Sequence, residues 1–220
     1  MGAPALGGYI CGVRTGNRAK PHTDPREKDP MPIDGKTRED AWRLVTEYTD
    51  SENLRHHMLA VEAAMRGYAQ KFGEDAEMWG IVGLIHDFDY EKHQGENGHP
   101  FVGVQILDKQ GWPREVRRAI LSHADYTGVP RESRMEKALY AVDELAGFLV
   151  ACALVRPSRS FSDLELKSVK KKLKDKTFCE PIDRAALKRA ADDLGVPFDK
   201  HIENVISFLR PAEKKLGLGK

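Results

Sequence analysis

The chain has 220 residues, 40% of them hydrophobic, which is enough to bury the core of one large domain or two small ones. Its 35 Lys and Arg residues nearly balance its 34 Asp and Glu residues, and the net charge of +1 argues against a general attraction to nucleic acid or to an anionic membrane. The three cysteines, Cys11, Cys152 and Cys179, are far apart, which argues against a disulfide framework or a thiolate zinc site and favours a cytoplasmic location.

Residues 1–35 are rich in Gly and Pro and show neither a helical nor an alternating period. A segment of this composition cannot offset the entropy lost on ordering, so we predict a disordered leader. The pattern becomes helical from Thr37 onward, and residues 36–220 are predicted to form one helical domain.

The first helix is predicted by Thr37 and Asp40, which resemble a capping box, and it should run to about Tyr48. Ser51 can cap a second helix, in which apolar residues recur in steps of four and three as far as Phe72. Later patterns predict helices over about 75–85, 100–110, 113–123, 134–154, 163–174, 182–194 and 199–215. No convincing strand pattern occurs, so the predicted fold class is all-α.

His57 lies at the margin of the apolar stripe of the second predicted helix. It comes one turn before Val61 and beside Leu54 and Met58, so its ring should face the edge of the core. For a histidine that stands alone, a single hydrogen bond in the core is the ordinary explanation, and a metal-binding role needs partners.

His86 and Asp87 follow one another where the third predicted helix ends. Successive side chains diverge inside a helix, but at its end both can turn toward one ion and pair a nitrogen with an oxygen ligand. The alternative is a histidine favoured by the helix dipole, followed by an aspartate of a turn.

Asp143 stands in an apolar stretch of the predicted helix 134–154, with Leu139 and Ala146 on its own face. An ionised carboxylate in such surroundings is costly unless it is paired or binds a metal. A basic partner from another element is an open alternative, and Glu144 competes for the role on periodicity alone.

In this order, His57, His86-Asp87 and Asp143 resemble the H…HD…D signature of the HD-domain superfamily of metal-dependent phosphohydrolases. The resemblance to a bacterial-type HD hydrolase subfamily extends from about residue 36 to the C-terminus. It includes the runs Ser51-Glu52-Asn53-Leu54, Gly83-Leu84-Ile85-His86-Asp87-Phe88-Asp89-Tyr90, His123-Ala124-Asp125-Tyr126-Thr127-Gly128 and Val142-Asp143-Glu144-Leu145. It implies a single HD-type helical bundle and a divalent metal held by His57, His86, Asp87 and Asp143.

Two imidazoles and two carboxylates leave open positions on a six-coordinate ion, which suits Mn²⁺, Fe²⁺, Co²⁺, Ni²⁺ or Mg²⁺ better than a closed zinc site, although Zn²⁺ is compatible. Some enzymes of the superfamily hold a second metal through two further histidines, and His99 and His123 fall in the corresponding interval. These two histidines are alternatively ligands of substrate phosphate, and His123 is a candidate proton donor to the leaving group. We expect one ion ahead of two. Asp89 either orients the attacking water or stabilises its loop.

Arg156 and Arg159 begin the one locally basic stretch and are candidates for binding substrate phosphate. The lysines that follow are typical of a solvated helix face.

The sequence thus predicts a divalent-metal-dependent phosphomonoesterase or phosphodiesterase that acts on a small phosphate ester, with nucleotides among the candidates, by attack of a metal-activated water. The alternative is a non-catalytic HD module that binds metal and nucleotide in a regulatory or scaffold role. Since degenerate binding modules typically lose a ligand, the intact set favours the enzyme. The expected partner is the small-molecule substrate, with neither nucleic acid nor membrane, and the sequence leaves the oligomeric state open.

Overall fold

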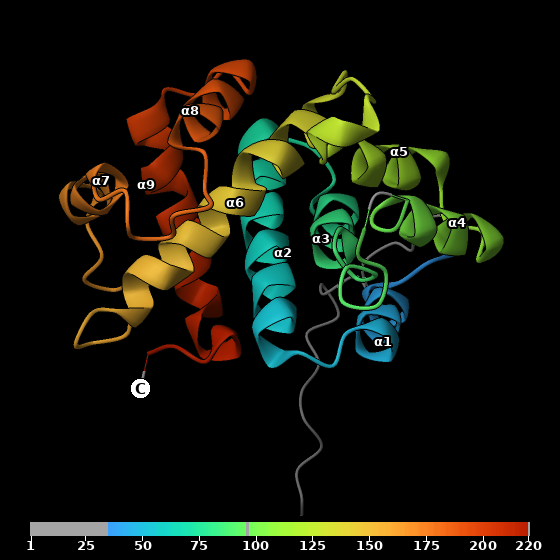
Figure 1. Ribbon diagram of the computed structural model, residues 1–220, viewed down its shortest axis with the longest axis horizontal. Helices are drawn as coiled ribbons and strands as arrows, with labels where there is room; N and C mark the ends of the chain where they lie inside the picture. Colours follow the sequence, from blue (N-terminus) through green and yellow to red (C-terminus); the bar gives the residue numbers. More distant parts are fainter. Residues whose placement is uncertain (1–34, 96, 220) are drawn as a thin grey trace, which may run out of the picture. The chain divides into compact units, whose positions relative to one another are not determined.

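The structure is a computed structural model that describes residues 35–95 and 97–219, which all belong to one compact unit. Apart from Gly35, the leader predicted over residues 1–35 lies outside the described residues. The fold of the described part is all-α, as predicted, and Figure 1 shows its helices. They are α1 (Arg38–Tyr48), α2 (Glu52–Phe72), α3 (Ala76–Ile85), α4 (Phe101–Lys109), α5 (Arg114–Ser122), α6 (Arg134–Leu154), α7 (Leu166–Lys174), α8 (Arg184–Asp193) and α9 (Phe198–Leu209).

The helix starts follow the local chemistry read from the sequence. Thr37 and Asp40 form the predicted capping box of α1, and Ser51 accepts a hydrogen bond from the backbone N–H of Leu54 at the start of α2. None of the helices within the described ranges is both long and apolar enough to cross a membrane.

The last predicted helix is shorter than expected. We predicted one helix over 199–215, whereas α9 ends at Leu209 and a 3-10 helix, Arg210–Leu216, follows it. Pro211 explains the difference, because a proline has no N–H for a helical hydrogen bond and its ring clashes with the preceding turn.

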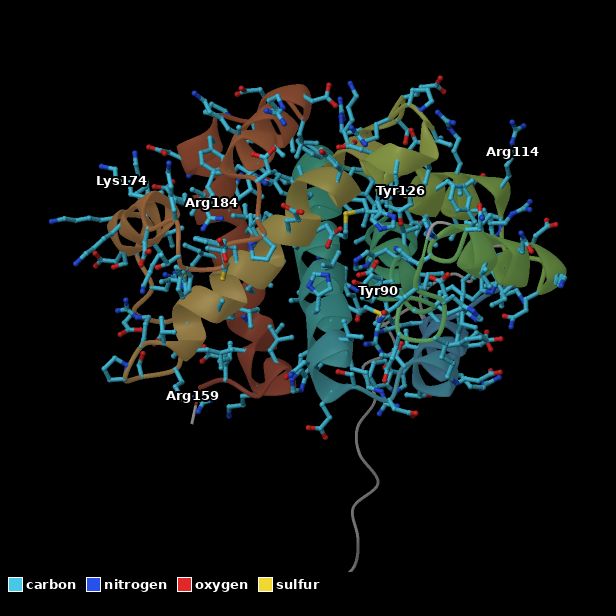
Figure 2. All side chains as sticks on the ribbon, viewed as in Figure 1. Tyr90, Arg114, Tyr126, Arg159, Lys174 and Arg184 are labelled. Atoms are coloured by element: carbon cyan, nitrogen blue, oxygen red, sulfur yellow. The ribbon has the colours of Figure 1, made fainter. Side chains whose placement is uncertain are left out.

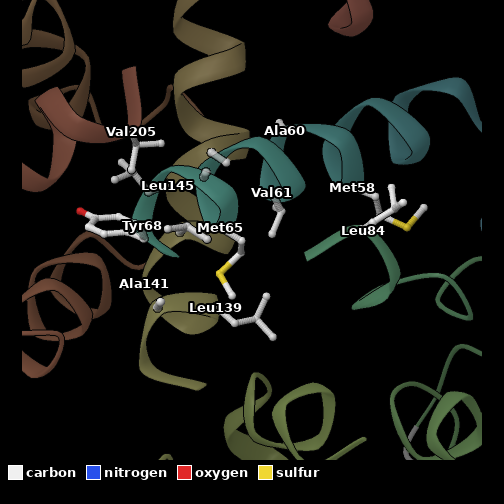
Figure 3. Close-up of a cluster of buried hydrophobic side chains, with 14 of the residues drawn as sticks. Met58, Ala60, Val61, Met65, Tyr68, Leu84, Leu139, Ala141, Leu145 and Val205 are labelled. Carbon is white, nitrogen blue, oxygen red and sulfur yellow. The ribbon is translucent and has the colours of Figure 1, made fainter. Parts of the chain in front are cut away.

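The core lies around α2 and α6, the two longest helices, which pack against each other. Figure 3 shows side chains from α2, α3, α6 and α9 meeting there, among them Met65, Leu84, Leu145 and Val205. These four side chains are buried. Together α2 and α6 form the frame on which α3 and α5 are placed, since both of those helices also contact α6.

Gly83 allows α3 to pack closely against α2. A Cβ at this position would lie 2.9 Å from the carbonyl oxygen of Val61, closer than real Cβ atoms approach a backbone. His57 lies one turn before Val61, and His86 lies one turn after Gly83. The close helix crossing therefore brings these two histidines together.

Candidate metal centre

The first group of polar side chains joins three helices at the crossing of α2, α3 and α6. His57 Nε2 lies 3.0 Å from Asp143 Oδ1, and His86 Nε2 lies 3.3 Å from the same oxygen. One nitrogen or oxygen from each of these residues lies within 4.8 Å of the others, which is a spacing that a single ion can bridge.

A second group lies beside the first and consists of Asp87, His99 and His123. His99 Nε2 is 3.1 Å and His123 Nε2 is 3.4 Å from Asp87 Oδ1. His99 stands just before α4, and His123 caps the C-terminal end of α5. The pair of helices after the His86-Asp87 turn thus supplies the two histidines of this group.

Asp87 connects the two groups because its oxygens face different histidines. Asp87 Oδ1 faces His99 and His123, while Oδ2 lies 3.4 Å from His86 Nε2 and 3.8 Å from His57 Nε2. The residue follows the end of α3, where the chain leaves the helix, so its side chain is free to turn between the groups.

Three of the four imidazoles are oriented through their Nδ1 atoms. His86 Nδ1 bonds to the Gly83 carbonyl at 2.8 Å, His123 Nδ1 bonds to the Ile120 carbonyl, and His99 Nδ1 lies 2.7 Å from Asp89 Oδ1. In the neutral ring a proton on Nδ1 leaves Nε2 unprotonated, and this is the form that binds a metal. The backbone thus fixes two of the rings, and a carboxylate fixes the third.

The contacts of Asp89 bear on its two predicted roles, which are to orient the attacking water or to stabilise its loop. Its side chain is fully buried, and its oxygens accept hydrogen bonds from His99 Nδ1–H and, at 2.7 Å, from the Gly103 N–H. The side chain is buried behind these contacts and does not line the cavity of the centre. Asp89 instead holds the His99 ring and the first turn of α4 in place.

The ionised carboxylates give the centre its charge. Burial opposes ionisation of Asp143, yet His86 and His57 beside it hold its pKa well below the usual range. Burial also disfavours a charged His99, but hydrogen bonds to Asp87 and Asp89 raise its pKa to about 9. The carboxylates thus attract positive charge, whether it comes from protons on the rings or from a cation.

The donor set fits one or two divalent cations. His86 Nε2 is completely buried and has no hydrogen-bond partner, although it points between two carboxylates. An unpaired buried nitrogen is costly, and coordination of an ion would satisfy it. Imidazole nitrogens and carboxylate oxygens together suit first-row transition metals and, less well, Mg²⁺.

A cavity of about 400 Å³ gives access to the centre. Asp87, Asp143, His99 and His123 contribute to its wall, and so do residues for which the sequence predicted no contact with substrate. These residues are Tyr90, Ala124, Asp125, Tyr126, Tyr140, Glu144, Asp183, Ala186, Leu187, Arg189 and Ala190. Asp125 and Tyr126 belong to the motif run that begins at His123, which gave a weak hint of their position. The residues of α8 could not be predicted, because this helix reaches the site through tertiary packing alone.

Arg156 and Arg159, the candidates for binding substrate phosphate, lie away from the cavity. Both follow the end of α6, on the order of 15 Å along the helix axis from Asp143, and neither lines the cavity. Figure 2 shows Arg159 near the end of α6 that lies away from Tyr90 and Tyr126. Arg156 is paired with Asp163 at 2.8 Å and stabilises the turn before α7.

A helical bundle with two adjoining sets of histidine and aspartate side chains defines an all-α protein with a candidate divalent-metal centre. Residues 54–147 match the family model of the HD domain, a range that contains every residue of both sets. The match spans less than half of the chain and agrees with the resemblance to the HD-domain superfamily of metal-dependent phosphohydrolases.

Three curated relatives share 28% identity with this chain over 98 residues, and all three are named Ribonuclease Y. They come from Nitratidesulfovibrio vulgaris strains DP4 and Hildenborough and from Oleidesulfovibrio alaskensis. The match covers 44% of this chain but 18% of each relative, so the chain spans less than a fifth of the length of these proteins. No solved structure matches the chain significantly.

Proposed function

We propose that the chain hydrolyses a small phosphate ester with the help of two divalent ions. One ion would be held by His57, His86, Asp143 and Asp87 Oδ2, and the other by Asp87 Oδ1, His99 and His123. The observation that carries the proposal is the division of the two Asp87 oxygens between separate pairs of imidazoles. It is the reason to prefer two ions over the single ion expected from the sequence.

Ions in such a centre polarise a phosphoryl group and lower the pKa of a water molecule. The residues of the chain prepare the site for this chemistry. Asp87 and Asp143 stay ionised and supply negative charge, while the hydrogen bonds at Nδ1 orient the rings of His86, His99 and His123 so that each Nε2 faces the carboxylates. The centre therefore needs little rearrangement when ions and ester bind.

The cavity supports a small ester as the substrate. Its volume of about 400 Å³ lies in the range that holds small ligands, and its wall is formed by α6, α8 and the segments after α3 and α5. Cleavage of RNA, which the relatives' name states, is also hydrolysis of a phosphate ester and supports the same reaction class.

The test combines elemental analysis of the purified protein with a panel of p-nitrophenyl phosphate and bis-p-nitrophenyl phosphate, assayed with Mn²⁺, Mg²⁺, Co²⁺ and Ni²⁺. Asp87→Ala should lose both metal and turnover, because one side chain serves both groups. Asp163→Ala, which removes an exposed carboxylate paired with Arg156, is the matched control and should keep both.

Full turnover by the Asp87→Ala variant would contradict the proposal. A wild-type protein that turns over nothing in the panel but binds a nucleotide tightly would favour the alternative, a non-catalytic metal- and nucleotide-binding module.

A further inference from the structure

Two of the large hydrophobic side chains that are exposed on the described part of the chain lie at the mouth of the cavity. Tyr90 is 43% exposed and Tyr126 is 64% exposed, and both line the cavity of the metal centre. Figure 2 shows both tyrosines on the side of the molecule formed by α3, α4 and α5. Exposed aromatic surface beside a polar site commonly marks a place where a ligand packs.

Tyr126 is held rigidly although it is exposed. Its hydroxyl donates to the His99 carbonyl at 2.7 Å, and the hydroxyl of its neighbour Thr127 donates to the Leu121 carbonyl at 2.8 Å. On the other side, Asp125 accepts hydrogen bonds from Arg131 and Tyr140 at 2.8 and 2.9 Å. The ring has therefore already lost most of its conformational freedom, which lowers the entropic cost of packing a ligand against it.

Tyr126 also stands between two hollows. One is the cavity of the metal centre, and the other is an open hollow lined by Gly95, Asn97, Phe101 and Tyr126 itself. The Phe101 ring lies edge-on to Tyr126, with centroids 6.4 Å apart. A substrate with its phosphate at the centre could thus extend a flat group over Tyr126 toward the outer hollow.

The charge of the cavity limits how many phosphates such a substrate carries. Beyond the candidate metal ligands, Asp125, Glu144 and Asp183 contribute carboxylates to the wall. Arg189 is the sole Lys or Arg among the residues that line it, and it pairs with Asp183 at 3.3 Å. A second or third phosphate would be repelled by these carboxylates, whereas a neutral aromatic group would not.

We propose that Tyr126 determines specificity by stacking against an aromatic base of the substrate, and that the substrate class is a nucleoside monophosphate. This inference rests on the proposed function, because the centre must bind the phosphate. The hydroxyl of Tyr126 holds the ring in place, and the face of the ring provides the contact. Stacking on an aromatic side chain tolerates any base, so recognition would be by shape and phosphate number.

The test compares adenosine 5′-monophosphate with ribose 5-phosphate, which differ in the base, on the Mn²⁺-loaded protein. We expect wild type to prefer the nucleotide in kcat/KM and Tyr126→Ala to reduce that preference about tenfold. Tyr126→Phe should keep most of it, since the aromatic face remains. Val155→Ala is the control, because Val155 is 58% exposed but follows the far end of α6.

An equal effect of Tyr126→Ala on both substrates would overturn the inference and leave Tyr126 as a tether of the His99 backbone. Better turnover of adenosine triphosphate than of the monophosphate would overturn the assigned substrate class. Calorimetric binding of the same ligands separates this inference from the proposed function. If the protein turns over neither substrate but still binds the nucleotide more tightly than the sugar phosphate, the proposed hydrolysis is refuted and the role of Tyr126 stands. If both ligands bind equally well, the role of Tyr126 is refuted.

Discussion

Asp89→Asn tests whether a buried carboxylate controls the second group of ligands. Asp89 accepts from two donors, His99 Nδ1–H and the Gly103 N–H, each at 2.7 Å. An asparagine of the same shape has one acceptor oxygen, so its NH₂ group must face one of those donors. Either the first turn of α4 loses its acceptor, or the His99 ring shifts its proton to Nε2 and no longer binds a metal.

The expected loss follows from the position of His99. Removal of a carboxylate that orients a ligating histidine typically lowers metal affinity by about 10- to 100-fold, which corresponds to about 1.4–2.8 kcal/mol. The affected site is the one formed with His99, while His57, His86 and Asp143 are untouched. We also expect the free energy of unfolding to fall by about 1–3 kcal/mol, because a buried hydrogen bond is lost.

The assay is calorimetric titration of the metal-free protein with Mn²⁺. Wild type should bind two ions, and Asp89→Asn should weaken one of them selectively. Glu62→Gln is the matched control, since Glu62 is also a buried carboxylate but pairs with Arg38 and Arg66. It should lower stability and leave both Mn²⁺ affinities unchanged. A folded Asp89→Asn protein with both wild-type affinities would refute the reasoning.

Other predictions concern packing and pH. A Cβ at Gly103 would lie 2.6 Å from Asp89 Cγ. Gly103→Ala should therefore weaken one Mn²⁺ site and lower the melting temperature in thermal unfolding. Wild-type values of the Mn²⁺ affinity and the melting temperature would show that α4 shifts freely. The carboxylates raise the pKa of His99 to about 9, and a metal that binds this ring must displace its proton. The Mn²⁺ affinity should therefore rise as the pH increases from 6 to 9. An affinity that does not change with pH in titration calorimetry would contradict this. Burial lowers the pKa of His201 from 6.5 to about 4, so between these pH values the unfolded chain binds one more proton than the folded chain. The free energy of unfolding should therefore fall by up to about 3 kcal/mol as the pH drops from 6.5 to about 4. Urea unfolding checks this, and His201→Gln, which cannot titrate, should show a shallower slope.

The helices were largely predictable because their signals are local. The capping box at Thr37 and the apolar period of residues 134–154 depend on neighbours within one or two turns, and both predictions were confirmed. The predicted helix over 163–174 starts later, at Leu166, because Asp163 accepts hydrogen bonds from Arg156 and Ser158 in a turn. That competing interaction becomes visible only when the end of α6 is in place.

The candidate site was predictable to a smaller extent. Asp143 was conspicuous because a carboxylate in an apolar helix needs a partner, and this reasoning requires no coordinates. The contact of Asp89 with the Gly103 N–H could not be predicted, since it depends on a helix whose placement is a tertiary property. The contribution of α8 to the cavity wall was hidden for the same reason, because nothing in residues 184–193 carries a motif.

The two ligand groups belong to different parts of the architecture. His57, His86 and Asp143 come from the central helices α2, α3 and α6 or their ends. His99 and His123 come from the segment between α3 and α6, which contains α4 and α5. The bundle core can therefore keep one complete set of candidate metal ligands when the segment that contains α4 and α5 changes in length or sequence. In the proposed two-ion centre, the first site thus depends on the bundle core and the second on the segment that contains α4 and α5.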